Sequence, residues 1–143
     1  MACTFCSIVS GDIPATKIYE ENKILAFMDI NPCNPGHVLI IPKQHYRNLF
    51  DIRPTTAGKI MEVGTKIASA IRLALNPDGL NLFQSNEKVA FQSVFHFHLH
   101  LIPRWEDDSL VLPWETKPGT LAEIQEIAVR IQEQLTTTRF GQQ

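Results

Sequence analysis

One run of the chain alternates apolar residues with histidines, and it constrains the fold more than any other feature. Successive side chains of a β-strand point to opposite faces, so this alternation predicts a strand over residues 94–102. The face expected to enter a core carries the apolar members: Phe95, Phe97, Leu99 and Leu101. The other face carries imidazoles about 6.6 to 6.8 Å apart, those of His96, His98 and His100.

Three imidazoles on one face indicate a functional site, because imidazole titrates near neutral pH, ligates metal ions and attacks electrophiles. Two other interpretations stay open. The histidines could be ordinary polar residues on an exposed strand face. They could also form a three-histidine zinc site, since alternating histidines on strands can ligate zinc.

Further strands and two helices are predicted from shorter patterns. Residues 17–30 form an expected hairpin that turns at Glu21 and Asn22, and 37–42 and 80–84 are two more expected strands. A helix is expected between a cap at Thr55 or Thr56 and the turn at 76–79, with this apolar stripe: Ile60, Val63, Ile67, Ile71 and Ala74. A second is expected over about 120–135, where Thr120 and Glu123 form a capping-box pattern.

The order of these elements predicts an α+β fold with an antiparallel sheet of about five strands and two main helices. The 143 residues are expected to form a single domain, with a core over about 3–105 followed by the C-terminal helix. These patterns leave the order of the strands in the sheet open.

Charge, hydropathy and cysteine content argue against several classes of partner and location. The formal net charge of -2 argues against nucleic acid as a partner. No apolar stretch approaches the ~20 residues of a membrane span, and no signal peptide is recognisable at the N-terminus. Three cysteines without an export signal predict a reducing, cytoplasmic location.

The first two cysteines, Cys3 and Cys6, have the spacing of half a zinc knuckle. A redox pair is a weaker alternative, because no strand precedes them to position a helix start as in thioredoxin-like folds. A metal-free N-terminus is a third possibility. Cys33 lies in a proline-rich loop and is interpreted as a free thiol.

Several motifs together resemble the histidine triad (HIT) superfamily, in its bacterial-type branch. The run from His96 to Ile102 resembles the family signature, and the other matching segments are 3–9, 13–15, 27–32, 35–43, and Asn86 with 92–94. The resemblance covers about residues 3–105, with a weaker match through the C-terminal helix. It implies a HIT-like fold and a homodimer whose two sheets join into one.

The resemblance also implies an enzyme that hydrolyses nucleotides at the α-phosphorus. His98 is then the nucleophile that forms a covalent nucleotidyl-histidine intermediate. The leading expectation is a purine nucleoside phosphoramidase. The alternatives are a dinucleoside polyphosphate hydrolase and a nucleotide-binding regulatory protein with incidental catalysis.

Other site residues follow from the same resemblance. His100 is expected to bind phosphate and to deliver a proton to the leaving group. His37 is expected to support the triad, although it could simply be a polar residue that begins a strand. Asp29 matches the acid that accepts hydrogen bonds from ribose hydroxyls; otherwise it is a solvated carboxylate.

The segment before the triad supplies the remaining nucleotide contacts that the resemblance implies: Asn86, Gln92 and Ser93. Strict alternation places Ser93 on the wrong face, so its role requires a bend or loop before Val94. Glu87 and Phe91 occupy positions where the family often has glycine. They predict a differently shaped loop and, at Phe91, an altered pocket wall.

The resemblance finally implies a structural zinc ion, held by Cys3, Cys6, His45 and His96 in a closed tetrahedral site. His96 would then anchor the strand while His98 and His100 carry out chemistry. The large residues Trp105 and Trp114, with the apolar segment 110–114, are expected in a dimer contact or near a partner active site. The alternative is packing within one subunit.

Overall fold

The computed structural model describes residues 3–137, which divide into two compact units at Ser109 and Leu110. In chain order, the elements of the first unit are α1 (Thr4–Ser10), β1 (Lys17–Glu20), β2 (Ile24–Met28), β3 (Val38–Pro42), α2 (Pro54–Leu75), β4 (Gly79–Phe83), the 3-10 turn η1 (Lys88–Ala90) and β5 (Leu99–Arg104). The second unit contains α3 (Leu121–Thr137).

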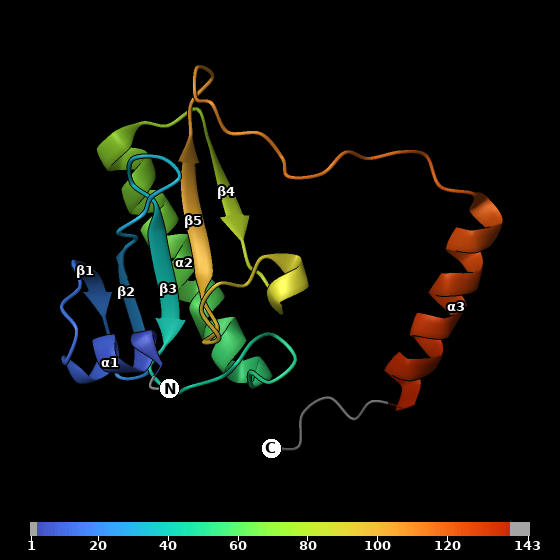
Figure 1. The fold of residues 1–143 in the computed structure, drawn as a ribbon, viewed down its shortest axis with the longest axis horizontal. Coiled ribbons are helices and arrows are strands. Elements are labelled where there is room, and N and C mark those ends of the chain that lie inside the picture. Colours follow the sequence, from blue (N-terminus) through green and yellow to red (C-terminus); the bar gives the residue numbers. More distant parts are fainter. Residues whose placement is uncertain (1–2, 138–143) are drawn as a thin grey trace. The chain divides into compact units, whose positions relative to one another are not determined.

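The five strands form one antiparallel sheet in the order β1-β2-β3-β5-β4 (Figure 1). The predicted α+β class is therefore confirmed. Strand β5 lies between β3 and β4, so His100 stands opposite Leu39 on one side and Phe83 on the other. A residue in this central position has neighbours on both sides, which restricts where its side chain can point.

The two faces of the sheet have different coverings. Helix α2 packs on one face, where its apolar stripe meets alternate strand residues (Figure 1). This larger core consists mainly of Ile24, Ala26, Val38, Ile40, Ile60, Val63, Ile67, Ile71, Phe97, Leu99 and Leu101. On the opposite face Phe5 and Ile8 of α1 pack against Leu25, Phe27, Leu39 and Ile41. In the histidine-bearing segment, the apolar side chains of Phe97, Leu99 and Leu101 therefore enter the core beneath α2, and the alternate side chains face the opposite side of the sheet.

The predicted strand over 94–102 is partly wrong, because β5 begins only at Leu99 and residues 94–96 form a bend. The backbone N–H of Phe97 donates to the carbonyl of Tyr46 at 2.7 Å, in a loop outside the sheet. Phe97 and Leu99 still enter the core as expected, but Phe95 is 37% exposed and does not. Residues 92 and 93 lie outside any strand, so the irregular segment expected before Val94 is present.

Helix boundaries also differ from expectation. Helix α2 begins at Pro54 with Arg53 as the capping residue, rather than at Thr55 or Thr56. Proline suits this first position, because its missing N–H would have no partner within the helix and its φ is already helical. Ala74, assigned to the buried stripe, is exposed near the end of the helix.

Helix α1 was not expected from the sequence. Its start is capped by the Cys3 sulfur, which accepts from the Cys6 N–H at 3.5 Å, and Gly11 ends it with a left-handed φ of 87°. A seven-residue helix has no lasting stability alone. Its apolar contacts to the sheet therefore hold it in place.

In the second unit, α3 has its predicted apolar stripe, but none of its residues is buried: Leu121, Ile124, Ile127, Ile131 and Leu135 are all exposed. The two residues of the expected capping box are in contact, but through their side chains: the Thr120 hydroxyl lies 3.5 Å from the Glu123 carboxylate. Within residues 3–137, no helix combines the length and the apolar character needed to cross a membrane.

Candidate functional site

Three histidines gather on the sheet face opposite α2. His37 comes directly before β3, His98 directly before β5, and His100 lies within β5. Odd-numbered residues of β3 and even-numbered residues of β5 share this face, as the pairing of Leu39 with His100 shows. His37 and His98 are only 2% and 3% exposed, so their hydrogen-bond partners are fixed by protein atoms rather than by water.

The ring of His98 presents one free nitrogen. Its Nδ1 lies 2.7 Å from the backbone carbonyl of His96, and a carbonyl can only accept. Nδ1 therefore carries the proton, and Nε2 of the neutral ring keeps its lone pair. The ring of Phe5 packs edge-on against that of His98, with centroids 5.2 Å apart, and restricts its rotation. A rigid imidazole with a bare nitrogen is what nucleophilic attack requires.

His37 and His100 are linked in a directional pair. The N–H of Cys33 donates to Nδ1 of His37 at 3.1 Å, so the proton of that ring sits on Nε2. Nε2 of His37 then donates to Nδ1 of His100 at 2.8 Å. As a result, Nε2 of neutral His100 carries a proton and is a donor. Asp29 joins this pair through an oxygen 3.6 Å from Nε2 of His37.

Burial keeps these rings neutral. It lowers the pKa of His100 to about 4, helped by the nearby His98 and His37. Burial likewise lowers the pKa of His98 and of His37, while Asp29 opposes the shift in both. Neutral imidazoles preserve both the lone pair of His98 and the hydrogen bond between His37 and His100.

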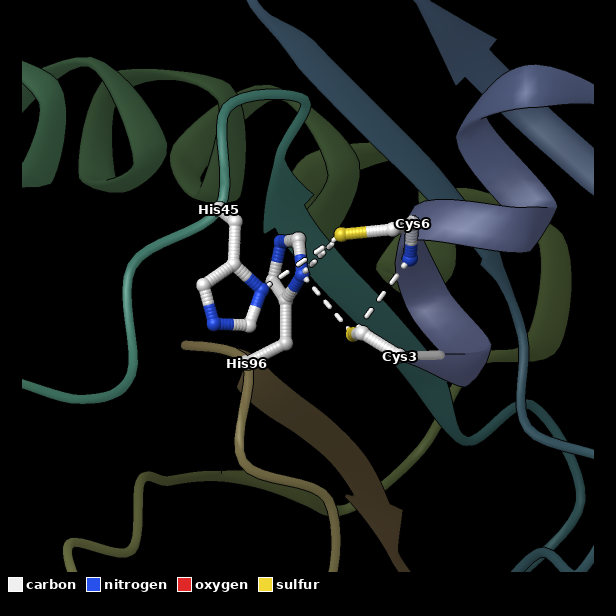
Figure 2. Close-up of side chains that lie close together, drawn as sticks. All are labelled: Cys3, Cys6, His45 and His96. Carbon is white, nitrogen blue, oxygen red and sulfur yellow. Dashed lines mark hydrogen bonds between the residues drawn. The ribbon is translucent and has the colours of Figure 1, made fainter. Parts of the chain in front are cut away.

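A second group of side chains converges beside the N-terminal helix. Cys3 and Cys6 come from the start of α1, His45 from the loop after β3, and His96 from the bend before β5 (Figure 2). One donor atom from each lies within 4.8 Å of all the others. The structure thus brings together all four residues expected to ligate zinc.

The spacing within this Cys/His cluster fits a tetrahedral ion. Zinc–sulfur bonds of about 2.3 Å and zinc–nitrogen bonds of about 2.0 Å separate the sulfur and nitrogen by about 3.5 Å at the tetrahedral angle. The Sγ atom of Cys3 lies 3.4 Å from His96 Nδ1, and that of Cys6 lies 3.6 Å from the same nitrogen and 3.4 Å from His45 Nδ1.

The orientation of His96 also suits ligation. Its Nε2 donates to the carbonyl of Pro42 at 2.8 Å, so Nδ1 is the bare nitrogen that faces the two sulfurs. Burial lowers the pKa of His96 to about 4 and raises the pKa of Cys6, whose thiol is also affected by its neighbour Cys3. Soft sulfur donors with neutral imidazoles are the donor set that zinc favours.

In the loop before the triad, two polar side chains bind backbone groups of the protein and one is exposed to solvent. Gln92 is buried and makes three backbone contacts: Oε1 accepts from Glu87 N–H, and Nε2 donates to the carbonyls of Arg47 and Val94. Asn86 Oδ1 accepts from the N–H of Leu49 at 2.7 Å. These amides shape the loop, whereas the Ser93 side chain is exposed at its end.

Asp29 has one oxygen committed and one directed toward the histidines. Its Oδ1 accepts from the N–H of Asn31 at 2.8 Å, which holds the carboxylate at the end of β2. Its Oδ2 is the atom near His37. The carboxylate is therefore anchored beside the histidine face, and its contacts are more specific than those of a solvated strand end.

Sequence patterns missed Phe5, Arg47 and Asn48. Phe5 packs against the rings of both His96 and His98. Its position between two cysteines that begin a helix is the signal that could have placed it at the site. Arg47 and Asn48 contact Glu87, and no spacing in the sequence links residues so far apart.

Residues 10–107 match the family model described as HIT domain. "Protein hit" of Bacillus subtilis is 44% identical over 115 residues, which cover 80% of this chain and 79% of that protein. Adenosine 5'-monophosphoramidase of Schizosaccharomyces pombe is 36% identical over 132 residues, covering 92% and 96%. An adenylylsulfatase of Arabidopsis thaliana is 41% identical over 108 residues, covering 76% and 55%.

Solved structures show the same relationship. A HIT family protein from Bacillus anthracis superposes with a TM-score of 0.86 at 43% identity, covering 92% of this chain and 96% of that chain. A Zn-bound histidine triad family protein from Mycobacterium smegmatis superposes with a TM-score of 0.74 at 39% identity, covering 96% and 99%.

Proposed function

This chain belongs to the HIT domain family, and from that premise we propose that it hydrolyses purine nucleoside phosphoramidates at the α-phosphorus. The observation that carries the proposal is the bare Nε2 of His98, created by the hydrogen bond from Nδ1 to the His96 carbonyl. The adenosine 5'-monophosphoramidase among the relatives supports this choice of leaving group.

In the first step the lone pair of His98 Nε2 attacks the α-phosphorus and the P–N bond breaks. The departing nitrogen takes the bonding electrons and a proton from solvent, and the nucleotide becomes bound to His98. The adduct ring is cationic, and its Nδ1–H continues to donate to the His96 carbonyl. Water then attacks the phosphorus and returns a proton to solvent as the bond from phosphorus to His98 breaks, which releases the nucleoside monophosphate and restores neutral His98.

His100 and its partner His37 serve the phosphate in this mechanism. The Nε2–H of His100 donates to a phosphate oxygen or to the leaving group, and the hydrogen bond from His37 keeps the proton on that nitrogen. Asp29 is assigned to the ribose hydroxyls. Asn86, Gln92 and Ser93 shape the loop that holds the phosphate, with the exposed Ser93 hydroxyl as the direct contact.

The Cys/His cluster of Cys3, Cys6, His45 and His96 is proposed to hold a structural zinc ion. All four ligand positions would be filled by protein atoms, so the ion stabilises structure and has no open position for substrate. It would tie α1 to the segment that carries His98. The Zn-bound relative supports this assignment.

We further propose a cytoplasmic homodimer of one domain per chain. The edge strand β4 has a neighbour on one side only and exposes Leu82, which suits pairing with a second copy. The segment from Leu110 to Trp114, which is exposed from Val111 onward, is a second candidate for that contact. The absence of a disulfide among Cys3, Cys6 and Cys33 suits a reducing compartment.

The proposal is tested by product analysis. The protein and its His98→Ala variant are incubated separately with adenosine phosphoramidate, a diadenosine polyphosphate and adenylyl sulfate, the last because a relative is an adenylylsulfatase. AMP released from the phosphoramidate by the unaltered protein alone supports the proposal. Preferred cleavage of the polyphosphate favours the dinucleoside polyphosphate hydrolase. Saturable nucleotide binding without turnover of any substrate favours a regulatory role.

A further inference from the structure

The loop between β4 and the triad holds two non-glycine residues in backbone conformations typical of glycine. Glu87 has φ 70° and ψ 158°, a region that is almost confined to glycine, and Phe91 has φ 70° and ψ 17°, in the left-handed region. An unaided loop would not keep such angles. They persist only where surrounding contacts hold the backbone.

The Glu87 carboxylate provides the strongest of these contacts. Arg47 binds it with two parallel hydrogen bonds, from Nε to Oε1 at 2.8 Å and from Nη2 to Oε2 at 2.7 Å. The amide of Asn48, which is buried, donates to Oε1 at 2.7 Å. A bidentate arginine–carboxylate pair fixes orientation as well as distance.

Backbone groups complete this connection between residues 47–49 and the loop. The N–H of Leu49 donates to Asn86, and Gln92 donates to the carbonyl of Arg47 while accepting from the N–H of Glu87. The Arg47 guanidinium also lies 4.4 Å from the ring centroid of Phe95, three residues before His98. Arg47 thus contacts both ends of the segment that leads into the triad.

We propose that Glu87 and Arg47 are positioning residues whose ion pair holds the glycine-free loop 86–93 in shape for nucleotide phosphate. The pair replaces the backbone freedom that glycine would give at position 87. This inference rests on the proposed function, because it assigns the loop to the phosphate of the same substrate. It makes substrate binding dependent on a side-chain contact outside the histidine face.

The pair is suited to positioning more than to global stability. Its side chains are 51% and 42% exposed, and exposed ion pairs contribute little to the free energy of unfolding. Dissolved salt screens such pairs. The unaltered protein should therefore bind substrate more weakly as ionic strength rises, and a variant without the pair should lose this dependence.

A double-mutant cycle tests the proposal with Arg47→Met, Glu87→Gly and the double variant. Arg47→Met should raise KM for adenosine phosphoramidate roughly tenfold with kcat within about twofold, because the loop binds ground state and transition state alike. In the Glu87→Gly background the same change should raise KM less than twofold, since glycine adopts the loop conformation without help. Lys17→Met is the matched control, because it removes an ion pair of similar exposure in β1.

Equal effects of Arg47→Met in both backgrounds, or no effect in either, would overturn the proposal. The same cycle can be measured without turnover, from the AMP dissociation constants of the four proteins determined by calorimetric titration at low and high salt. These constants test the positioning role even if the protein does not hydrolyse the phosphoramidate. If Arg47→Met does not fold, Arg47→Lys keeps the charge without the bidentate geometry and should show a smaller KM increase with the same dependence on residue 87.

Discussion

The Cys/His cluster and the histidine face share one short segment of chain, yet they place their imidazoles in opposite ways. In His96, Nε2–H donates a hydrogen bond to the carbonyl of Pro42, and the unprotonated Nδ1 faces two sulfurs. In His98, Nδ1–H donates to the carbonyl of His96, and Nε2 is unprotonated. The role of each ring is thus decided by which nitrogen meets a backbone carbonyl, rather than by the spacing of the histidines.

The two regions also differ in how their donors are connected. In the Cys/His cluster, bare atoms from three separate segments converge within 4.8 Å, which suits a shared ion. On the histidine face, Nε2 of His37 donates a hydrogen bond to Nδ1 of His100, and one nitrogen of His98 has no hydrogen-bond partner among the described residues. The first arrangement can surround an ion with four protein atoms, whereas the second leaves a lone pair on His98 that no described residue uses.

Removal of the His98 ring should have the largest effect, because it should abolish activity at the histidine face and leave metal binding at the Cys/His cluster unchanged. The His98→Ala variant should lose turnover by on the order of 10⁴-fold, because no other neutral imidazole presents a bare nitrogen in its place. Its zinc content should be unchanged. Product release measured beside elemental analysis checks both parts, and near-normal turnover would show that another group attacks phosphorus.

Removal of the two sulfurs should have the reverse effect. The Cys3→Ser, Cys6→Ser variant should lose bound zinc and melt on the order of 10 °C lower, because α1 is then held by its apolar contacts alone. Turnover should fall by less than about tenfold, since the carbonyl that orients His98 remains. The matched variant His45→Ala should behave similarly. Full zinc content in the double serine variant would place the metal elsewhere.

Loss of the His37 ring should lower turnover without abolishing it. The His37→Ala variant removes the hydrogen bond that holds the proton of His100, so turnover should fall roughly 10- to 100-fold. Steady-state kinetics with the phosphoramidate measures this loss. An unchanged rate would show that His37 has no part in the chemistry and only begins a strand.

The smallest expected effect is a dependence of stability on pH. The folded-state pKa of His100 is about 4, below its ordinary value of 6.5, and that of His37 is also lowered. The unfolded chain therefore binds these protons more readily. Their contribution to stability is complete above pH 6.5 and is lost as the pH falls toward 4, which should cost on the order of 1 to 3 kcal/mol.

Urea unfolding of the Cys3→Ser, Cys6→Ser variant at several pH values measures this dependence without a contribution from zinc release. The same series on that variant carrying His100→Gln should show a shallower slope. Identical slopes in the two proteins would show that His100 does not titrate below its ordinary range.

The period-3.6 stripe predicted α2 well, because that helix buries one face over many residues. The apolar run at 37–42 predicted β3, which is buried throughout, whereas the period-two pattern predicted only the later part of the histidine-bearing segment as a strand. The ligand set of Cys3, Cys6, His45 and His96 was predicted through a family resemblance, and the structure brings these residues together. The bend at residues 94–96 is not visible in the local pattern, because its contacts lie far away in the sequence: the His96 ring donates to the carbonyl of Pro42 at the end of β3, and the Phe97 N–H donates to that of Tyr46.

The contact between Arg47 and Glu87 escaped prediction for a similar reason. Charged residues 40 positions apart carry no periodic signal, and their meeting depends on how two irregular loops cross. The positive φ of Glu87 was equally hidden, since sequence patterns alone place a glutamate in that region only rarely. Sequence patterns predict helices and strands, whereas much of the candidate site lies in the irregular segments between them.

The hydrogen bond from His98 to the carbonyl of residue 96 has an evolutionary consequence. Every amino acid supplies a backbone carbonyl, so this hydrogen bond does not depend on which side chain stands at position 96. Under the proposed function, selection on the reaction and selection on the metal would therefore act on different atoms of one residue. A lineage could then acquire or lose the ion while the proposed attacking nitrogen of His98 keeps its orientation.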